Sequence, residues 1–247
     1  MNTGISRTTD RDVRLRPCVR SANPTAASSL LTSLVSYWDF NETRGVRVDK
    51  LGVNSLANVS VDPGYTSGKL GNALTVGNVR VLSHSGLQFG AGSFTIAGWV
   101  KFTALSGTVG VVTKSNASGD RQFELQWNSG ISRLRFGISS TSTATLVALA
   151  DATNFGALST GTWYFVCCWY DATAGQIGIQ VNATTPNTAA HTLGSYAGTQ
   201  ALVFGAFSES LQMSGYLDEW GLWSRALTST ERSELYNSGN GKTYPFS

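Results

Sequence analysis

From Leu34 onward, the strongest pattern in this chain of 247 residues is an alternation of apolar and polar side chains with a period of two. In the segment FTIAGWVKF, residues 94–102, one face carries Phe, Ile and Val, whereas Thr95, Trp99 and Lys101 lie on the other. Successive side chains of a β-strand point to opposite faces of a sheet, so this period predicts strands that bury one face. We therefore expect an all-β chain built from half-buried antiparallel strands.

Other segments repeat this period, and one departs from it. The segments QFELQW, residues 122–127, and SRLRFGIS, residues 132–139, alternate cleanly. By contrast, WYFVCCWY, residues 163–170, is apolar or aromatic on both faces. That pattern predicts a central strand with other side chains packed on each side of its sheet. Clusters of Gly, Ser, Asn and Thr separate the segments about every ten residues, as is typical of a β-sandwich or barrel.

A short helix is predicted near the end of the chain. Thr228 and Glu231 have the spacing of a capping box, in which each side chain accepts a backbone N–H of the first turn. Leu235 and Tyr236 form its apolar side, and Gly239 is expected to close it. The chain has no apolar run near the roughly 18 residues that a membrane-spanning helix requires, so we expect no membrane insertion.

Residues 1–33 differ from the rest of the chain. They contain no aromatic residue, five arginines and two aspartates, which leaves thirteen basic and thirteen acidic residues in the remainder. A segment this poor in apolar side chains cannot form a core, so we interpret it as a basic N-terminal arm attached to a domain of residues 34–247. It lacks the apolar stretch of about 7 to 15 residues that a signal peptide needs, so we expect a protein made in a cytoplasm without export.

The arginines of the arm are candidate docking residues: Arg7, Arg11, Arg14, Arg16 and Arg20. Arginine forms bidentate pairs with carboxylates, and a flexible arm becomes ordered when it finds them. The expected partner is therefore an acidic protein surface. Nucleic acid is a poorer partner, because the arm has no aromatic side chains to stack on bases and the domain is neutral. A solvated tail is the alternative interpretation of the arm.

The three cysteines, Cys18, Cys167 and Cys168, do not form a disulfide framework, because their number is odd and adjacent residues of a strand face apart. They indicate a reducing compartment and are expected to be buried apolar thiols. The two histidines, His84 and His191, have no short Cys or His spacing around them. A zinc site is therefore not expected.

Five blocks of sequence follow one another between about residues 34 and 239. They are LVSYWDFNETRG, SGKLGNALTVGN, GSFTIAGWVKF, LSTGTWYFVCCWYDATAGQIGIQVN and GYLDEWGLWSRALTSTERSELYNSG. In this order and spacing they resemble the laminin-G-like domains of the concanavalin A-like lectin/glucanase superfamily, in its bacterial and phage branch. The resemblance implies a two-sheet antiparallel jelly-roll β-sandwich of about a dozen strands, which agrees with the alternation. It implies no single function, because this fold hosts lectins, enzymes and inert spacers.

The resemblance also implies a candidate calcium site, since related jelly rolls bind calcium through carboxylates and backbone carbonyls. Asp39 and Asp218 match acidic positions of the first and last blocks, and the carbonyls of Gly71 and Asn72 are candidates to complete the site. Calcium requires six to eight oxygen ligands, and the alternative is that both aspartates accept nearby loop amides. A structural calcium ion is the one cofactor that we consider.

Catalysis is not expected. The glucanases of the superfamily place Glu and Asp side chains at alternate positions of one strand, because hydrolysis needs two carboxyl groups flanking the bond. Here Glu124 stands between Gln122 and Gln126, which cannot serve as acid or nucleophile. Asp218 and Glu219 are adjacent, so they are expected to face apart. A glucanase is therefore the least favoured interpretation.

Glycan binding would require exposed aromatic rings with polar partners, because the apolar face of a sugar stacks on a ring. Trp99 and Trp127 are the two candidates. Trp99 shares a face with Thr95 and Lys101, whereas Trp127 follows Leu125 on an apolar face, for which core packing is the alternative.

These features together predict a non-catalytic virion protein, such as a phage capsid decoration, head-fibre or tail-associated protein. Its arm would dock on a capsid or other virion protein, and its lectin-like domain would bind glycans of the host surface. We expect a homo-oligomer within the assembly. The alternative is a carbohydrate-binding or adhesion module of a bacterial surface protein, which would require an export route.

Overall fold

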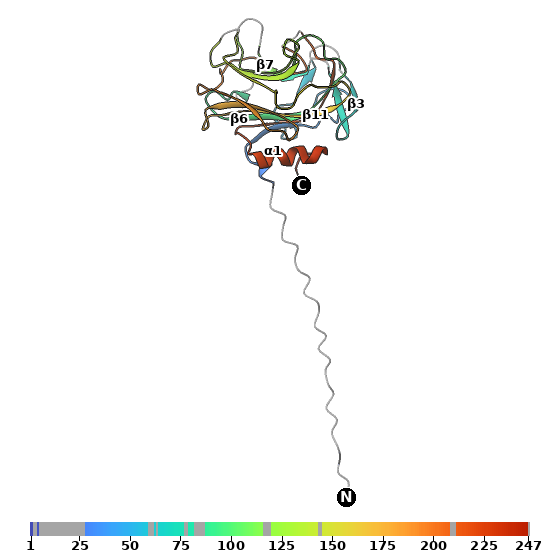
Figure 1. Cartoon of the computed structure of the whole chain (residues 1–247). Helices are drawn as coiled ribbons and strands as arrows, with labels where there is room; N and C mark the ends of the chain where they lie inside the picture. The colour runs from blue at the N-terminus through green and yellow to red at the C-terminus, as the bar shows by residue number, and fades with distance from the viewer. Residues whose placement is uncertain are drawn as a thin grey trace.

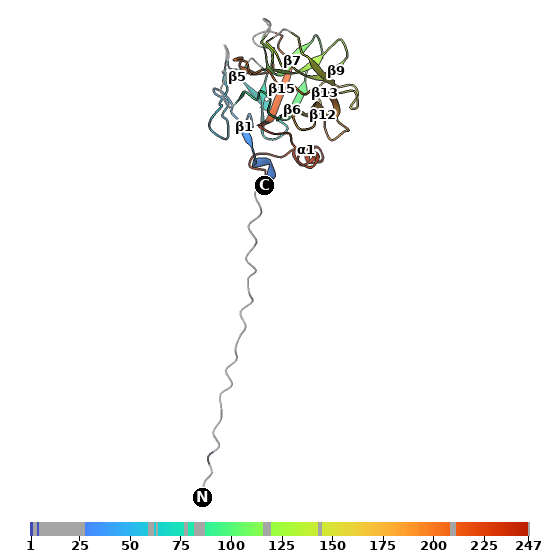
Figure 2. The same ribbon diagram turned by 90° about the vertical axis from the view of Figure 1, so that its left-hand side faces the viewer.

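The computed structural model describes residues 1, 4, 28–58, 62, 64–76, 79–81, 87–115, 120–142, 145–207 and 211–246. Over these residues the chain forms two antiparallel sheets packed face to face, with one short helix on the outer side of the larger sheet (Figure 1). Figure 2 shows that the first strand and the helix lie on the same side of this sandwich. The architecture confirms the predicted jelly-roll β-sandwich.

The larger sheet has eight strands and contains the longest ones. In spatial order they are β13 (Asn187–Ala190), β12 (Gln176–Val181), β11 (Trp163–Asp171), β6 (Phe94–Phe102), β15 (Gly215–Trp223), β4 (Asn72–Thr75) and β3 (Tyr65–Ser67). The first strand, β1 (Leu34–Trp38), pairs with the C-terminal half of β15, beyond the pairing of β15 with β4. The N-terminal and C-terminal strands of the domain therefore lie side by side.

The smaller sheet has seven strands. In spatial order they are β10 (Ala148–Asp151), β9 (Arg133–Ile138), β8 (Phe123–Asn128), β7 (Val109–Lys114), β14 (Leu202–Phe204), β5 (Val79–Val81) and β2 (Ala57–Asn58). The three strands β7, β8 and β9 follow one another in sequence and in space, so they form an antiparallel meander.

The inner core lies between the sheets and follows the predicted alternation. In β6, the side chains of Phe94, Ile96, Val100 and Phe102 are fully buried in this core. In β8, Phe123, Leu125 and Trp127 face it in the same way. The period of two therefore identified the inward face of both strands.

A second, outer core covers the opposite face of the eight-stranded sheet. Phe165, Cys167 and Trp169 of β11 belong to it, whereas Cys168 points into the inner core, so the two cysteines face apart as predicted. Both are buried free thiols, and burial raises the pKa of Cys167 to about 12. Cys18 lies outside the described residues. This packing on both faces confirms the prediction for residues 163–170.

The outer core is closed by the C-terminal helix α1 (Ser229–Tyr236). The predicted capping box is present, since Thr228 accepts from the Glu231 amide and Glu231 accepts from the Thr228 amide. The predicted end is wrong, because Asn237 adopts a left-handed φ of 48° and ends the helix before Gly239. A 3-10 turn, Asn237–Gly239, follows.

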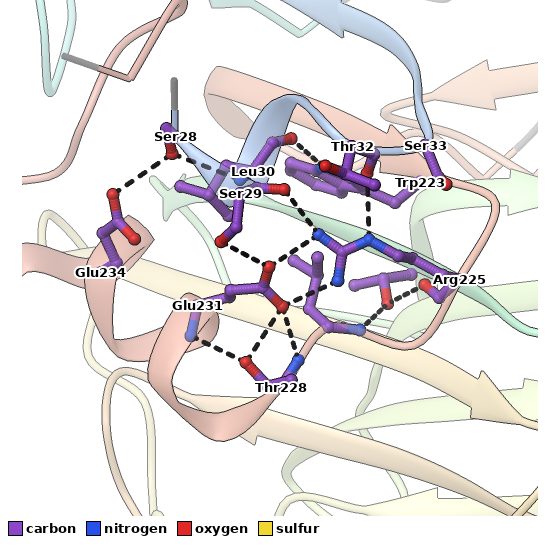
Figure 3. A network of polar contacts seen from close by, with 12 residues as sticks. Ser28, Ser29, Leu30, Thr32, Ser33, Trp223, Arg225, Thr228, Glu231 and Glu234 are labelled. Carbon is purple, nitrogen blue, oxygen red and sulfur yellow. Dashed lines mark hydrogen bonds and ion pairs between the residues drawn. The ribbon is translucent and has the colours of Figure 1, made fainter. Parts of the chain in front are cut away.

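The start of the described chain is held against α1 by a polar network that we call the clamp: Ser29, Thr32, Arg225, Thr228 and Glu231 (Figure 3). The Arg225 guanidinium donates to both carboxylate oxygens of Glu231, at 2.7 Å each, and to the carbonyls of Ser29 and Thr32. Ser29 belongs to a 3-10 turn, Ser29–Leu31.

Apolar burial reinforces the clamp. Leu30 is fully buried, and its carbonyl accepts the indole N–H of Trp223 at 2.7 Å. Residues 28–33, which the sequence analysis assigned to the arm, are thus packed as part of the domain. The docking candidates Arg7, Arg11, Arg14, Arg16 and Arg20 lie outside the described residues. Within the described part of the chain, no helix is long and apolar enough to cross a membrane.

Candidate ligand-binding site

A β-bulge in β15 brings two acidic side chains to one face of the sheet. The pairing of β15 with β6 shifts register between Asp218 and Gly221, and Glu219 has a positive φ of 53°. An extra residue in one strand shifts the alternation of all that follow. Leu217 and Trp220 therefore both face the inner core although they are three residues apart. The expectation that Asp218 and Glu219 face apart is wrong.

This acidic pair is buried. The Asp218 carboxylate accepts the backbone amides of Lys69 and Leu70, at 2.7 and 2.9 Å, and Glu219 accepts the Tyr37 hydroxyl. One oxygen of each carboxyl group, Asp218 Oδ1 and Glu219 Oε1, has no hydrogen-bond partner. Burial raises the pKa of both Asp218 and Glu219 to about 8. Both groups are therefore mostly protonated at neutral pH.

The calcium candidates Asp39 and Asp218 are close enough for the charge of Asp39 to raise the pKa of Asp218. Asp39, however, pairs with the Lys50 ammonium at 2.8 Å, and Asp218 Oδ2 accepts two amides. Asp39 also accepts the Asn41 side-chain amide at 3.0 Å, so both aspartates accept nearby amides, as in the alternative interpretation. Within the described residues, no group of three or more His, Cys, Asp and Glu side chains is placed to hold a metal. Calcium requires six to eight oxygen ligands, and the acidic pair offers only two oxygens without a hydrogen-bond partner.

Gln122, which precedes β8, shares the outward face of this strand with Glu124 and Gln126. In the glucanases of the superfamily, the resemblance implies carboxyl groups at such alternate positions. Gln122, Glu124 and Gln126 are 0%, 2% and 6% exposed. Glu124 pairs with Arg121 at 3.2 Å, while burial raises the pKa of Glu124. The Gln122 side-chain amide donates to the Gly198 carbonyl at 2.6 Å. Glu124 thus has glutamines, rather than a second carboxyl group, at the neighbouring positions of its face.

Neither predicted tryptophan is an exposed platform. Trp127 is 4% exposed and packs in the inner core. Trp99 does lie on the outer face, as predicted, but it is only 2% exposed. The ring of Tyr236, from α1, stacks at 5.9 Å from it between ring centroids. The helix that follows the last strand therefore removes Trp99 from solvent.

Two partly exposed aromatic rings lie one row further along the same strands. Tyr216 of β15, Lys101 of β6 and Trp163 of β11 are register partners across the sheet. All three side chains are partly exposed. The Lys101 ammonium lies 4.8 Å from the centroid of the Trp163 ring and 4.9 Å from that of Tyr216. We call these three residues the aromatic–lysine row.

This row has the chemistry of a small-ligand surface. Two flat apolar rings offer stacking area, and the cation between them offers three hydrogen-bond donors. Sequence reasoning missed Trp163 and Tyr216, since Trp163 begins a segment that is apolar on both faces and reads as wholly packed. The one available signal was Lys101, a lysine on an otherwise buried strand.

A family model described as the concanavalin A-like lectin/glucanases superfamily matches residues 75–231, more than half of the chain. The chain belongs to this family. A search among curated proteins found no match.

Several solved structures share the fold. Domain 4 of AbnA, a GH43 extracellular arabinanase from Geobacillus stearothermophilus solved with arabinotriose, is 17% identical with a TM-score of 0.60, over 82% of this chain and 97% of that one. The binding domain of Paraclostridial Mosquitocidal Protein 1 is 13% identical with a TM-score of 0.65, over 84% of this chain and 52% of that one.

Trypanosoma rangeli sialidase is also 13% identical, with a TM-score of 0.61 over 85% of this chain. This chain spans only 33% of the sialidase structure. At these identities, the likenesses establish the fold alone.

Proposed function

We propose that the domain is a non-catalytic glycan-binding module whose ligand rests on the aromatic–lysine row. The observation that carries the proposal is the pair of partly exposed rings, Trp163 and Tyr216, on either side of Lys101. An exposed ring can stack on the apolar face of a pyranose, and a polar group beside it can bind the sugar hydroxyls. The solved arabinotriose complex of the similar arabinanase domain supports a carbohydrate as ligand, and the glutamines beside Glu124 disfavour hydrolysis.

The test is a glycan array probed with the full chain and with Trp163→Ala. We expect the variant to bind its glycan at least about tenfold more weakly, which corresponds to roughly 1.4 kcal/mol. Tyr216→Ala is probed in the same way, with Tyr65→Ala as its matched control, because Tyr65 is 51% exposed on the edge strand β3 of the same sheet. Equal binding by Trp163→Ala and the parent protein would reject the row as the site.

We further propose that the domain is displayed on a virion by its arm. The clamp holds the root of the arm beside Trp223, at one end of β15, whereas Tyr216 lies at the other end of the same strand. At about 3.3 Å per residue, the two lie roughly 20 Å apart. Attachment at one end and an open ligand row at the other suit a displayed binding module.

Deletion of residues 1–27 tests the display proposal, because it removes the arm and keeps the clamp. The truncated protein is expected to fold and bind glycan normally but to be lost from purified particles. Light scattering after gel filtration then compares the oligomeric state of the two chains. Normal incorporation would reject docking by the arm, and detection of the protein on bacterial cells alone would favour the surface-adhesin alternative.

A structural calcium ion near Asp218 remains a separate proposal, supported by the unpartnered Oδ1 atom of this residue. Bound calcium would raise the melting temperature, because a ligand that binds only the folded state stabilises it. The melting temperature is measured with calcium and with a chelator, for the parent chain and for Asp218→Asn. A parent chain that melts at the same temperature with calcium and with the chelator would reject the ion.

A further inference from the structure

The Lys101 ammonium covers both rings of the aromatic–lysine row. It lies over Trp163 and Tyr216 at nearly equal distances, 4.8 and 4.9 Å from the ring centroids. A sugar that stacks on the face of either ring that the ammonium occupies must compete with this cation. A neutral sugar offers no charge in return for the lost cation–π contacts, whereas an acidic sugar does.

A second lysine adds positive charge beside the row. The Lys69 ammonium lies 4.8 Å from the centroid of the Trp99 ring. Trp99 precedes Lys101 by two residues on β6, so the Trp99 ring and the Lys101 side chain lie on the same face of the sheet. Among the described residues, no ion pair joins either ammonium to a carboxylate.

Asp218, an acidic side chain on this face, does not neutralise the two lysines. Asp218 pairs with Trp99 across the sheet and is fully buried. Its Oδ2 atom accepts the backbone amides of Lys69 and Leu70. Because burial raises the pKa of Asp218 to about 8, the carboxyl group is mostly uncharged at neutral pH. Two ammonium groups that no carboxylate pairs with among the described residues therefore lie on this face.

We propose that the row selects acid-bearing saccharides, with the anionic group bound by the Lys101 ammonium. The anion draws the ammonium away from the two rings, and the ring faces then receive the apolar face of the sugar. A carboxylate and a sulfate ester share the required chemistry. The inference rests on the proposed glycan-binding function and assigns the ligand class for the same site.

The experiment measures binding of the full chain to two matched pairs of probes: trigalacturonate against its methyl ester, and dextran sulfate against dextran. The methyl ester and dextran keep the sugar rings and lose the charge. We expect at least one acidic probe to bind about tenfold or more tightly than its neutral partner. The preference for trigalacturonate over dextran sulfate, or the reverse, identifies the anion as carboxylate or sulfate.

Lys101→Met is the decisive variant, because it keeps the length of the side chain and removes the charge. It is expected to reduce the ratio of acidic to neutral binding to about one, since neutral sugars no longer compete with a cation. Arg133→Gln is the matched control, because it removes one positive charge from the other sheet and should leave the ratio unchanged.

The outcomes separate the two proposals. Equal binding of acidic and neutral probes, lost in Trp163→Ala, would overturn the acidic selectivity and leave glycan binding intact. An unchanged ratio in Lys101→Met would overturn the role of this lysine. Failure to bind either acidic probe would overturn the inference, while the array decides independently whether the row binds glycans.

Discussion

The outer faces of the two sheets are covered in opposite ways. On the eight-stranded sheet, Phe165, Cys167 and Trp169 lie beneath α1 in an apolar outer core. On the seven-stranded sheet, Gln122 and Glu124 are equally buried but polar, and Gln122 donates to a loop carbonyl. Both faces are closed at their centres, yet the first leaves aromatic rings partly exposed where its cover ends.

This difference is the structural basis of the proposed separation between attachment and ligand binding. The elements outside the sandwich, namely the clamp and α1, pack against the outer face of the eight-stranded sheet. At the other end of the same strands lies the aromatic–lysine row, where Trp163 packs against the outer core and the three side chains remain partly exposed. The proposed ligand surface is thus the partly exposed edge of a face that is otherwise buried.

The largest effects on stability are expected when a side chain of the inner core or of the outer core is truncated to alanine. Trp220 is fully buried in the inner core, so Trp220→Ala should reduce the free energy of unfolding by about 3–5 kcal/mol. Leu235, 4% exposed, contributes to the outer core from α1, and Leu235→Ala should cost about 2–3 kcal/mol.

Urea unfolding measures these costs, and Leu149→Ala is the matched control for Leu235→Ala. Leu149 is 40% exposed on β10, so its truncation should change stability by no more than about 0.5 kcal/mol. A cost for Leu235→Ala as small as that of Leu149→Ala would mean that α1 is not part of the cooperative fold.

The acidic pair should make stability fall as pH rises. Asp218 and Glu219 keep their protons to about pH 8 in the folded chain, whereas carboxyl groups of an unfolded chain ionise near pH 4. Their contribution is therefore full below about pH 4 and is lost as pH rises towards 8. Asp218→Asn removes one titrating group and still accepts the two backbone amides.

Unfolding free energies at pH 5 and pH 8 test this prediction. The parent chain should lose at least about 1 kcal/mol more than Asp218→Asn over this interval, because each unit of pKa difference is worth about 1.4 kcal/mol. Parallel pH profiles for the two proteins would show that Asp218 is already ionised at pH 5.

The clamp should respond to pH in the opposite direction. Hydrogen bonding to Arg225 holds the pKa of Glu231 at about 2, below its usual value. The stability contributed by Glu231 is therefore present above about pH 4.5 and is lost as pH falls towards 2. Glu231→Gln should cost about 1–2 kcal/mol at pH 7 and progressively less in acid.

Hydrogen exchange at the amides of Leu31 and Thr32 reports on the clamp directly, since both bond within its 3-10 turn. Faster exchange is expected in Glu231→Gln. Glu234→Gln is the control, because Glu234 is 32% exposed, pairs with Lys242 and makes only a long contact of 3.4 Å with Ser28. Equal exchange in the two variants would show that the clamp does not hold the arm root.

Local patterns predicted the strands, the capping box and the opposite orientation of Cys167 and Cys168, because each depends on residues close in sequence. The bulge was visible only as the spacing of Leu217 and Trp220, three residues apart instead of two. That the two carboxyl groups meet beside Tyr37 depends on the pairing of β1 with β15, which no local pattern shows.

Exposure was the property least accessible from the sequence. Trp99 and Trp163 both belong to aromatic strands of the same sheet, and their patterns do not tell which is covered. Tyr236 stacks on Trp99 from more than a hundred residues away in the chain, whereas Trp163 packs against the rim of the outer core and stays partly exposed. The exposure of each ring therefore depends on contacts between segments that are far apart in the sequence.

The smallest stability effect is expected for Lys101→Met. The Lys101 ammonium is partly exposed and contacts two rings, each such contact contributing about 0.5–1 kcal/mol at an exposed site. The methionine side chain retains apolar and sulfur contacts with the same rings, which offsets much of this loss. The free energy of unfolding should therefore change by less than about 1 kcal/mol. A melting curve close to that of the parent chain would assign any change in ligand preference to the missing charge, whereas a loss like that of Leu235→Ala would make Lys101 a structural residue of the outer face.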